Sequence, residues 1–437
     1  MKNKSSKTRT IKVDYLARVE GEGALYIKIA DGIVKDVNLK IFEAPRFFEA
    51  LLQGRDFTEA PDITSRICGI CPVAYLMSAC HAMEDICKVQ IPTELRNLRR
   101  LIYCGEWIKS HSLHIFMLNL PDLLGFDDAI GMAQQHPDVV KNGLRLKKIG
   151  NTLMELVGGR DIHPINVKVG GFYKAPTASE LNDLVPELKK CLDLAINALD
   201  FFSKLNYFDY EEDYEFVALS HPEEYPFNEG DLISNKGLNF NISEFDKYFI
   251  EEHVPHSTAL HTYLKDRGEC FVGPLARYAL NFEKLTPKAK KAAKKINILG
   301  QCNNPSKGIL IRTIEVIFAL EEALHIINSY KQAESCILVK PTAGVGYGCT
   351  EAPRGICFHK YEIDDSGNIL YANIVPPTAI NQKTIEKDIR NIVYNLVKTN
   401  PNIKDKELQS YSEQLIRSYD PCISCSTHFL DLTVDRQ

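Results

Sequence analysis

The sequence lacks two features that would point to a membrane or a nucleic acid: a long apolar run and an excess of positive charge. Its 437 residues include 52 Lys and Arg and 57 Asp and Glu, which gives a formal net charge of -5. A transmembrane helix needs about 20 consecutive apolar residues, and a nucleic-acid surface needs clustered basic side chains. We therefore expect no membrane segment and no nucleic-acid partner.

Internal repeats, low-complexity tracts and recognisable linkers are also missing. Hydrophobic residues make up 45% of the chain, which is enough for a large core. The simplest organisation is a single domain over residues 1–437, with a polar, basic start at 1–10 that we expect to be disordered. No apolar segment of a secretory signal follows this start, so we expect a cytoplasmic protein.

Cysteine, by contrast, is abundant, and four cysteines form two Cys-x-x-Cys pairs at opposite ends of the chain. Cys68 and Cys71 are one pair, and Cys422 and Cys425 are the other. The pairs of a zinc ribbon lie about 15–20 residues apart, whereas 354 residues separate Cys68 from Cys422 (422 minus 68). The spacing predicts a single metal site that the fold assembles from both ends.

The other cysteines are expected to be core residues, because none has the spacing of a ferredoxin cluster motif. The total of 13 is odd, so the cysteines cannot all pair in disulfides. We expect no iron–sulfur cluster in this chain, and electrons would have to leave through another subunit. These residues are Cys80, Cys87, Cys104, Cys191, Cys270, Cys302, Cys336, Cys349 and Cys357.

Hydrophobic periodicity predicts an α+β fold, mainly α, with a central long-helix bundle and small antiparallel β regions. One β region is expected near the N-terminus, over 11–42, and another around 357–376, with a turn at Asp364–Gly367. The predicted helices are Pro72–Cys87, Glu94–Leu120, Leu144–Leu156, Ser179–Leu205, Pro287–Ile298, Ile309–Ala333 and Gln382–Thr399.

Ligand type alone does not identify the metal, because soft thiolates bind zinc, copper(I), nickel or an iron–sulfur cluster. A structural zinc site would need no ionisable groups around it. This chain nevertheless carries Arg18-Val-Glu20-Gly, Glu351-Ala-Pro-Arg-Gly355 and, directly before the second pair, Asp420. These groups favour a reactive centre, although a structural zinc-thiolate protein stays an alternative.

From Asp14 to His428 the sequence closely resembles the large, catalytic subunit of nickel–iron hydrogenases. The motifs that carry the resemblance are Ile-Phe-Glu-Ala-Pro-Arg-Phe-Phe-Glu49, Arg-Ile-Cys-Gly-Ile-Cys-Pro-Val-Ala-Tyr75 and Asp-Pro-Cys-Ile-Ser-Cys-Ser-Thr-His428. They are most similar to the cytoplasmic, bidirectional, NADP-linked sulfhydrogenase branch. The resemblance implies the large-subunit fold and the reversible heterolytic cleavage of H2 to protons and electrons.

The resemblance also implies a ligand set. Cys68 and Cys422 would be terminal nickel ligands, and Cys71 and Cys425 would bridge nickel to an iron that carries CO and two cyanides. A hydroxyl at Thr378 would hydrogen-bond one cyanide. A second cation, magnesium or iron, would be bound by the remaining residues that match the family: Glu49, His428 and the backbone carbonyl near Ile374.

Catalytic roles follow from the same resemblance. Arg354 would face the open metal position and polarise H2, with Pro353 beside it and with Asp122 and Asp420 holding it in place. Cys422 would pass a proton to Glu20, the proton exit of the family. His163 resembles a residue that faces the small subunit, and a core histidine with a satisfied hydrogen bond is the alternative interpretation.

The implied partners are an iron–sulfur small subunit and further subunits that bind FAD and NAD(P). Nickel-insertion factors and a maturation protease are also expected, and the protease would remove residues 429–437. One departure is Tyr75, which stands where many relatives have a histidine that supports a bridging sulfur. A non-catalytic, quinone-site relative from a respiratory complex is the other alternative, and it would have lost the cysteines that this chain retains.

Two further patterns have structural interpretations. His111 and His114 share a helix face and are expected to support the active-site helix rather than bind a metal. The glycines of Gly344-Val-Gly-Tyr-Gly348 are expected to permit close backbone packing beside Arg354.

Overall fold

The computed structural model describes residues 8–332 and 334–427. His428 and the expected maturation peptide, 429–437, therefore lie outside the described residues. Residues 8–10 were expected to be disordered, but this expectation is wrong. They begin strand β1 (Thr8–Val13), in which Thr8 pairs with Ala30 and Arg9 is held by Asp405 and by the carbonyl of Ile403.

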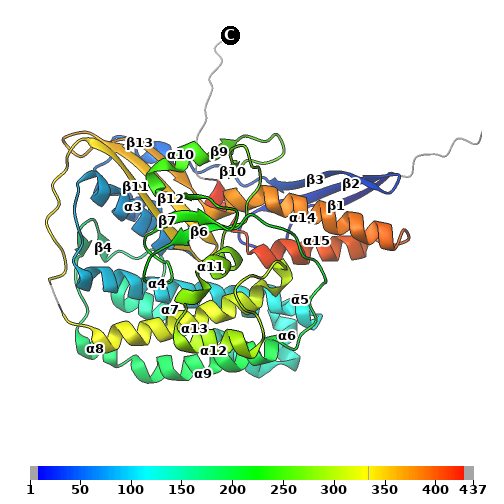
Figure 1. Ribbon diagram of the computed structural model, residues 1–437, viewed down its shortest axis with the longest axis horizontal. Coiled ribbons are helices and arrows are strands. Elements are labelled where there is room, and N and C mark those ends of the chain that lie inside the picture. Colours follow the sequence, from blue (N-terminus) through cyan, green and yellow to red (C-terminus); the bar gives the residue numbers. More distant parts are fainter. Residues whose placement is uncertain (1–7, 333, 428–437) are drawn as a thin grey trace, which may run out of the picture.

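The N-terminal sheet is antiparallel, in the order β1-β2-β3, with β2 at Gly23–Ala30 and β3 at Ile33–Ile41. Alternate residues of β2 point to opposite faces, so Leu25, Ile27 and Ile29 are buried. This sheet lies beside helices α14 (Pro377–Thr399) and α15 (Asp405–Tyr419) in Figure 1.

Long helices form the lower half of the molecule in Figure 1 and contribute a large part of the main core. They are α4 (Thr93–Leu113), α7 (Pro137–Gly158), α9 (Val185–Phe202) and α13 (Gly308–Ser329). Helix α13 is buried on nearly every side, and it packs against both α4 and α9. The expected mainly α architecture with a helix bundle is thus observed.

The helix expected over Glu94–Leu120 is interrupted. After α4, the backbone widens into a π-helical segment, η1 (His114–Asn119), before the short helix α5 (Leu120–Leu124). Pro121 has no N–H to donate to the preceding turn, which disfavours a regular α-helix there.

A second three-stranded sheet, β11-β12-β13, packs on helix α3 (Pro72–Ile86). Strand β11 (Gly344–Ala352) was not predicted, whereas β12 (Gly355–Ile363) and β13 (Ile369–Val375) match the expected hairpin. The glycines of β11 do permit close packing, but the partner is α3 and not Arg354. A Cβ at Gly348 would lie 2.0 Å from the carbonyl oxygen of Ser78, so only glycine fits there.

Helix α15 was not predicted, because its sequence is polar around a narrow apolar stripe. It ends at Tyr419, and Asp420 follows in the left-handed conformation with φ 57°. Among the described residues, no helix is long and apolar enough to cross a membrane.

The remaining helices are mostly short, and the remaining strands form small antiparallel sheets. The helices are α1 (Phe48–Leu52), α2 (Ala60–Ser65), α6 (Ala129–Gln135), α8 (Ala178–Asn182), α10 (Phe245–Tyr248), α11 (Pro274–Asn281) and α12 (Pro287–Lys295). The strands are β4 (Val167–Lys168), β5 (Gly171–Phe172), β6 (Val217–Ser220), β7 (Asp231–Ser234), β8 (Asn239–Phe240), β9 (Phe249–Glu252) and β10 (His261–Leu264).

Candidate metal centre

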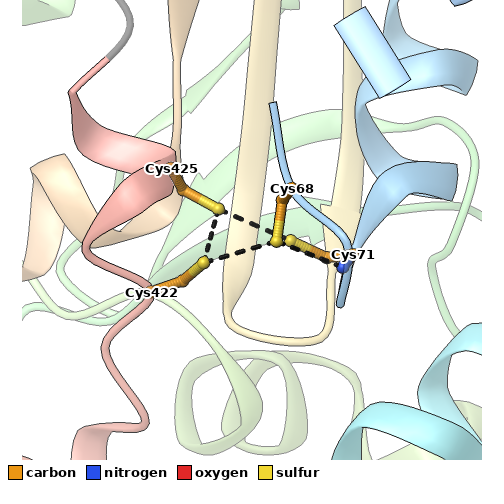
Figure 2. A group of neighbouring side chains, drawn as sticks. All are labelled: Cys68, Cys71, Cys422 and Cys425. Carbon is orange, nitrogen blue, oxygen red and sulfur yellow. Dashed lines mark hydrogen bonds between the residues drawn. The ribbon is translucent and has the colours of Figure 1, made fainter. Parts of the chain in front are cut away.

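The two Cys-x-x-Cys pairs converge in the interior. Cys68 and Cys71 lie directly before α3, and Cys422 and Cys425 lie in the segment after α15. Figure 2 shows the four side chains pointing toward one another from these two segments. The Sγ atoms are 3.4 Å apart for Cys68 and Cys422, 3.6 Å for Cys71 and Cys425, and 2.7 Å for Cys422 and Cys425.

The charge state of these thiols depends on their burial and on one another. Burial raises the pKa of the Cys422 thiol, and its hydrogen bonds to the other three cysteines raise it further. Cys68 is the exception, because hydrogen bonds from Cys422, Cys425 and Cys71 lower its pKa. Four thiolates in so small a volume repel one another, so a bound cation is the natural counter-charge. The donor set therefore fits a soft metal.

The N-terminus of α3 fixes the first pair. Pro72 occupies the first helical position, where the missing N–H costs nothing. The carboxylate of Glu106 on α4 accepts hydrogen bonds from the N–H groups of Val73 at 2.6 Å and Ala74 at 3.3 Å. Lys109, one turn further along α4, lies 3.4 Å from the carbonyl oxygen of Gly69.

Arg46 joins the two cysteine segments. Its guanidinium donates to the carbonyl of Ile67, at 2.7 Å, and to the carbonyl of Ser424. Its backbone N–H donates to the carbonyl of Thr427 at 2.8 Å. Sequence reasoning assigned no role to Arg46, although it stands in the motif that ends at Glu49.

Arg354 lies beside the cysteines and is held by Asp420. Its Nε donates to the Asp420 carbonyl at 2.6 Å, and its Nη2 to Oδ1 of Asp420 at 3.0 Å. Burial opposes its charge, but Asp420 and then the thiolates of Cys422, Cys71 and Cys68 outweigh burial and raise the pKa of Arg354. Its Nη1 is buried with no hydrogen-bond partner in the described part of the chain.

Asp122 does not hold Arg354, so that expectation is corrected. Its carboxylate instead binds Arg417, at 2.7 Å to Nε and 3.0 Å to Nη2, and also Arg18. Asp122 lies at the start of α5, where these two arginines meet it from α15 and from the N-terminal loop.

Arg277 holds the segment that leads to Arg354, and sequence reasoning missed it. This buried guanidinium donates to the carbonyls of Ala352 at 2.7 Å and Pro353 at 2.9 Å. It also pairs with Glu315 and Glu351, at 2.8 and 2.9 Å. A lone arginine in a helix such as α11 gives no sequence signal of this role.

Glu20 contacts Cys422 directly. The Cys422 thiol donates to Oε2 of Glu20 at 3.0 Å, and the N–H of Ser424 donates to the same oxygen at 3.0 Å. The Ser424 hydroxyl lies between this carboxylate, to which it donates, and Oε2 of Glu43, 3.2 Å away. Glu43 is a further candidate for proton transfer, and sequence reasoning did not single it out.

Thr378 lies in the first turn of α14, and its hydroxyl oxygen accepts the N–H of Cys422 at 3.0 Å. Glu49, in the short helix α1, accepts the N–H of Ile374 at 2.7 Å. Burial raises the pKa of Glu49 to about 8, against the lowering effect of the Ile374 hydrogen bond. Two of the three expected second-site residues are thus adjacent, and the third, His428, is outside the described residues.

Tyr75 is buried, and its hydroxyl makes no hydrogen bond among the described residues. Its ring lies 5.8 Å from the ring of His359, which β12 contributes. A buried imidazole is therefore present next to the position where relatives have histidine, although it comes from a different element.

Three further histidines have structural partners. Nε2 of His111 lies 2.9 Å from Glu315, and that of His114 lies 2.7 Å from the carbonyl of Arg417. Their expected supporting role agrees with these contacts. His163 is half-buried and lies 2.7 Å from the carbonyl of Ser65. Of the nine other cysteines, seven are buried, whereas Cys87 and Cys336 are partly exposed.

Comparison with known proteins identifies the family. The nickel-dependent hydrogenase family matches residues 46–141 and 261–428. Sulfhydrogenase 2 subunit alpha of Pyrococcus furiosus is 34% identical over 428 residues, which cover 97% of this chain and 100% of that protein. NAD-reducing hydrogenase HoxS subunit beta of Cupriavidus necator is 27% identical over 467 residues, covering 97% of this chain and 95% of that protein.

A solved structure of an NAD+-reducing NiFe hydrogenase in the H2-reduced state superposes with a TM-score of 0.87. It is 26% identical and covers 96% of this chain and 99% of that chain. These findings confirm the fold and the resemblance to the sulfhydrogenase branch, and they do not favour the zinc or the non-catalytic alternative. The chain belongs to the nickel-dependent hydrogenases, oxidoreductases that act on H2.

Proposed function

We propose that this chain is the subunit that cleaves H2 reversibly, and that Cys68, Cys71, Cys422 and Cys425 hold its nickel, with Cys71 and Cys425 shared with iron. The observation that carries the proposal is the convergence of four buried sulfurs beside a buried arginine. When bound, a nickel–iron group with CO and two cyanides supplies an electron-rich metal position at which H2 is polarised.

Arg354 provides the positive charge at this position. Asp420 binds two of its nitrogens and leaves Nη1 without a partner in the described structure. Because its pKa is raised, Arg354 stays charged and stabilises the negative charge that develops as H2 is polarised. Arg277 would be a positioning residue, because it holds the carbonyls of Ala352 and Pro353.

A proton released at the centre would leave through Cys422 and Glu20. The donor and acceptor are 3.0 Å apart, within the reach of direct transfer. The Ser424 hydroxyl then connects Glu20 to Glu43, and both carboxylates are half-buried. Replacing Glu20 with Gln keeps the shape but removes the proton acceptor.

The second site is proposed to hold magnesium or iron through Glu49, His428 and the Ile374 carbonyl. Carboxylate and carbonyl oxygens are the ligands that magnesium prefers, and Glu49 lies against the Ile374 backbone. Thr378 would donate its hydroxyl hydrogen to a cyanide, because its oxygen already accepts from Cys422.

The proposed partners are an iron–sulfur small subunit and subunits that bind FAD and NAD(P). Support comes from the names of two relatives, one an alpha subunit and one part of an NAD-reducing enzyme. The cytoplasmic location, the maturation protease and the nickel-insertion factors stay predictions from the sequence.

Metal analysis and infrared spectroscopy of the purified holoenzyme test the proposal. We expect one nickel per chain, iron, and bands from metal-bound CO and cyanide. Cys422→Ser should lose nickel and all H2 oxidation, whereas Cys87→Ser, at a partly exposed cysteine outside the centre, should keep both. A holoenzyme that carries zinc and no nickel would refute the assignment.

Proton transfer is tested separately by the rate of H2 oxidation in a variant of Glu20. Glu20→Gln should retain nickel and the infrared bands but lose at least about tenfold in H2 oxidation, because an acid–base group typically contributes more than that. Glu22→Gln, at an exposed neighbouring carboxylate, is the matched control. Unchanged activity in Glu20→Gln would exclude this exit.

A further inference from the structure

Two histidines and a carboxylate meet on one side of α14, outside the cysteine centre. His256 lies in the loop between β9 and β10, His261 is the first residue of β10, and Glu386 lies on α14. One side-chain atom from each residue lies within 4.8 Å of the other two. The β9–β10 hairpin and α14, which are far apart in sequence, thus present nitrogen and oxygen ligands to one point.

The distances suit a metal ion. Nε2 of His256 lies 2.8 Å from Oε1 of Glu386. The rings of His256 and His261 have centroids 5.6 Å apart and are inclined at 83°. A tetrahedral ion with bonds of about 2.0–2.1 Å holds its ligand atoms about 3.3 Å apart. Small side-chain movements would therefore suffice to bind one.

His261 gives an independent indication of a missing ligand. Its side chain is 1% exposed, and its Nε2 is buried with no hydrogen-bond partner in the part of the chain that the structure describes. A buried polar atom without a partner lowers stability, and such atoms are rare in folded proteins. A metal ion at this point would satisfy the nitrogen.

The surroundings hold the three residues in place. Oε1 of Glu386 also accepts the N–H of Leu39 at 2.8 Å, which fixes the carboxylate. One turn earlier on α14, Gln382 donates to the carbonyl of Leu260 at 2.8 Å and accepts from Ser257 at 3.3 Å. These bonds fix the loop that carries His256 against α14, as outer contacts do in metal sites.

We propose that His256, His261 and Glu386 bind one divalent ion of the zinc class, with solvent at the remaining position. Two imidazoles and one carboxylate suit zinc, whereas magnesium prefers oxygen ligands alone. The side chains of His256 and Glu386 are 22% and 15% exposed, which leaves a route for entry. Lys383 beside the site is paired with Glu252 at 3.3 Å, which offsets its charge.

The ion would have a structural role. It would tie the β9–β10 hairpin to α14, whose first turn carries Thr378, the residue that binds the backbone of Cys422. We expect it to stabilise the protein without changing activity per nickel. This inference is independent of the proposed function, because it concerns a different set of ligands.

Zinc titration of the holoenzyme tests the site. After treatment with a mild chelator, wild-type holoenzyme should take up one zinc per chain while its nickel and iron contents stay constant. His261→Gln and His256→Gln should weaken zinc binding at least about 100-fold, because even outer-contact changes cost 10–100-fold. His253→Gln, at an exposed histidine three residues before His256, should bind zinc like the wild type.

Two outcomes would overturn the proposal. One is wild-type holoenzyme, full in nickel, that takes up no zinc at micromolar concentration. The other is equal zinc uptake by His261→Gln, His256→Gln and the wild type, which would mean that the zinc binds at other residues. If His261→Gln fails to fold and lacks nickel, the test rests on zinc binding by His256→Gln, in which the replaced residue is more exposed. Visible bands of bound Co2+, lost in the same variants, provide a second readout.

Discussion

The two cysteine pairs reach the same centre by different means. The first pair precedes a long buried helix, and Sγ of Cys68 accepts N–H groups of its own segment, from Ile70 at 3.3 Å and Cys71 at 3.4 Å. The second pair follows α15 and has only the short turn η5 (Ser424–Ser426) of its own. Its backbone is held by remote residues, among them Thr378, Glu20 and Arg46.

The first pair is thus positioned mainly by local structure, whereas the second pair is positioned mainly by long-range contacts. The start of α3 can position Cys68 and Cys71 once the helix is docked, with help from one neighbouring helix. Cys422 and Cys425 reach their places only when α14, the N-terminal loop and the Arg46 segment are all assembled. Metal binding should therefore be more sensitive to contacts of the second segment than to contacts of the first.

The largest effect is expected from Arg46→Ala, because Arg46 holds both segments. The change leaves the carbonyls of Ile67 and Ser424 without their donor, at a cost of about 2–4 kcal/mol. We expect most nickel to be lost, as measured by metal analysis of the purified protein. Arg55→Ala, at an exposed arginine nearby, should retain full nickel. Equal nickel in both variants would show that the two segments do not need this link.

A smaller effect is expected from Thr378→Val, which acts on the second segment alone. Valine has nearly the same shape but leaves the buried N–H of Cys422 unsatisfied, at a cost of about 1–3 kcal/mol. Thermal denaturation should show a lower midpoint, and nickel content should fall partly. Thr378→Ser keeps the acceptor and should restore both values; a serine variant as impaired as the valine variant would argue against the hydrogen bond.

The smallest effect on nickel content is expected from Glu106→Gln, which acts on the first segment and whose main consequence is a change in the pH dependence of stability. Burial raises the pKa of Glu106 from its ordinary 4.5 to about 8, against the lowering effect of the Val73 N–H. The Glu106 carboxyl thus binds its proton more tightly in the folded state than in the unfolded state. The stabilisation that comes from this protonated carboxyl is present below pH 4.5 and is lost as the pH rises to about 8. The stability advantage of wild type over Glu106→Gln should shrink between pH 5 and pH 8, by about 1–3 kcal/mol.

Denaturant unfolding at several pH values measures this difference. Glu94→Gln, at an exposed carboxylate near the start of α4, should show no such pH dependence relative to wild type. A gap between wild type and Glu106→Gln that stays constant with pH would mean that Glu106 does not titrate in this window.

Periodicity predicted most of the long helices and both main β regions, because apolar spacing reports which face of an element is buried, and it missed several short helices. It missed β11, whose glycine-rich sequence lacks strand propensity, and α15, which is polar around a narrow stripe. It also joined α4 to α5, since a π-helical segment such as η1 keeps the apolar pattern of a helix.

Within the site, motif spacing identified the four cysteines, and the resemblance placed Arg354 and Glu20. The structure brings Arg354 to Asp420 and Glu20 to Cys422. The expected role of Asp122 was wrong because Arg18 and Arg417 reach it instead. Arg46, Glu106 and Arg277 were missed because they act on backbone atoms of remote segments, which no local pattern records.

The sequence by itself determined the chemistry of this protein: which thiols, carboxylates and arginine are available, and which elements carry them. Tertiary structure alone decided the partnerships, such as Arg46 joining two segments and His261 meeting His256 and Glu386. The physical reason is that side-chain type and spacing act over a few residues. The partner of a buried charge or of an unpaired buried nitrogen, in contrast, is determined only where distant segments pack together.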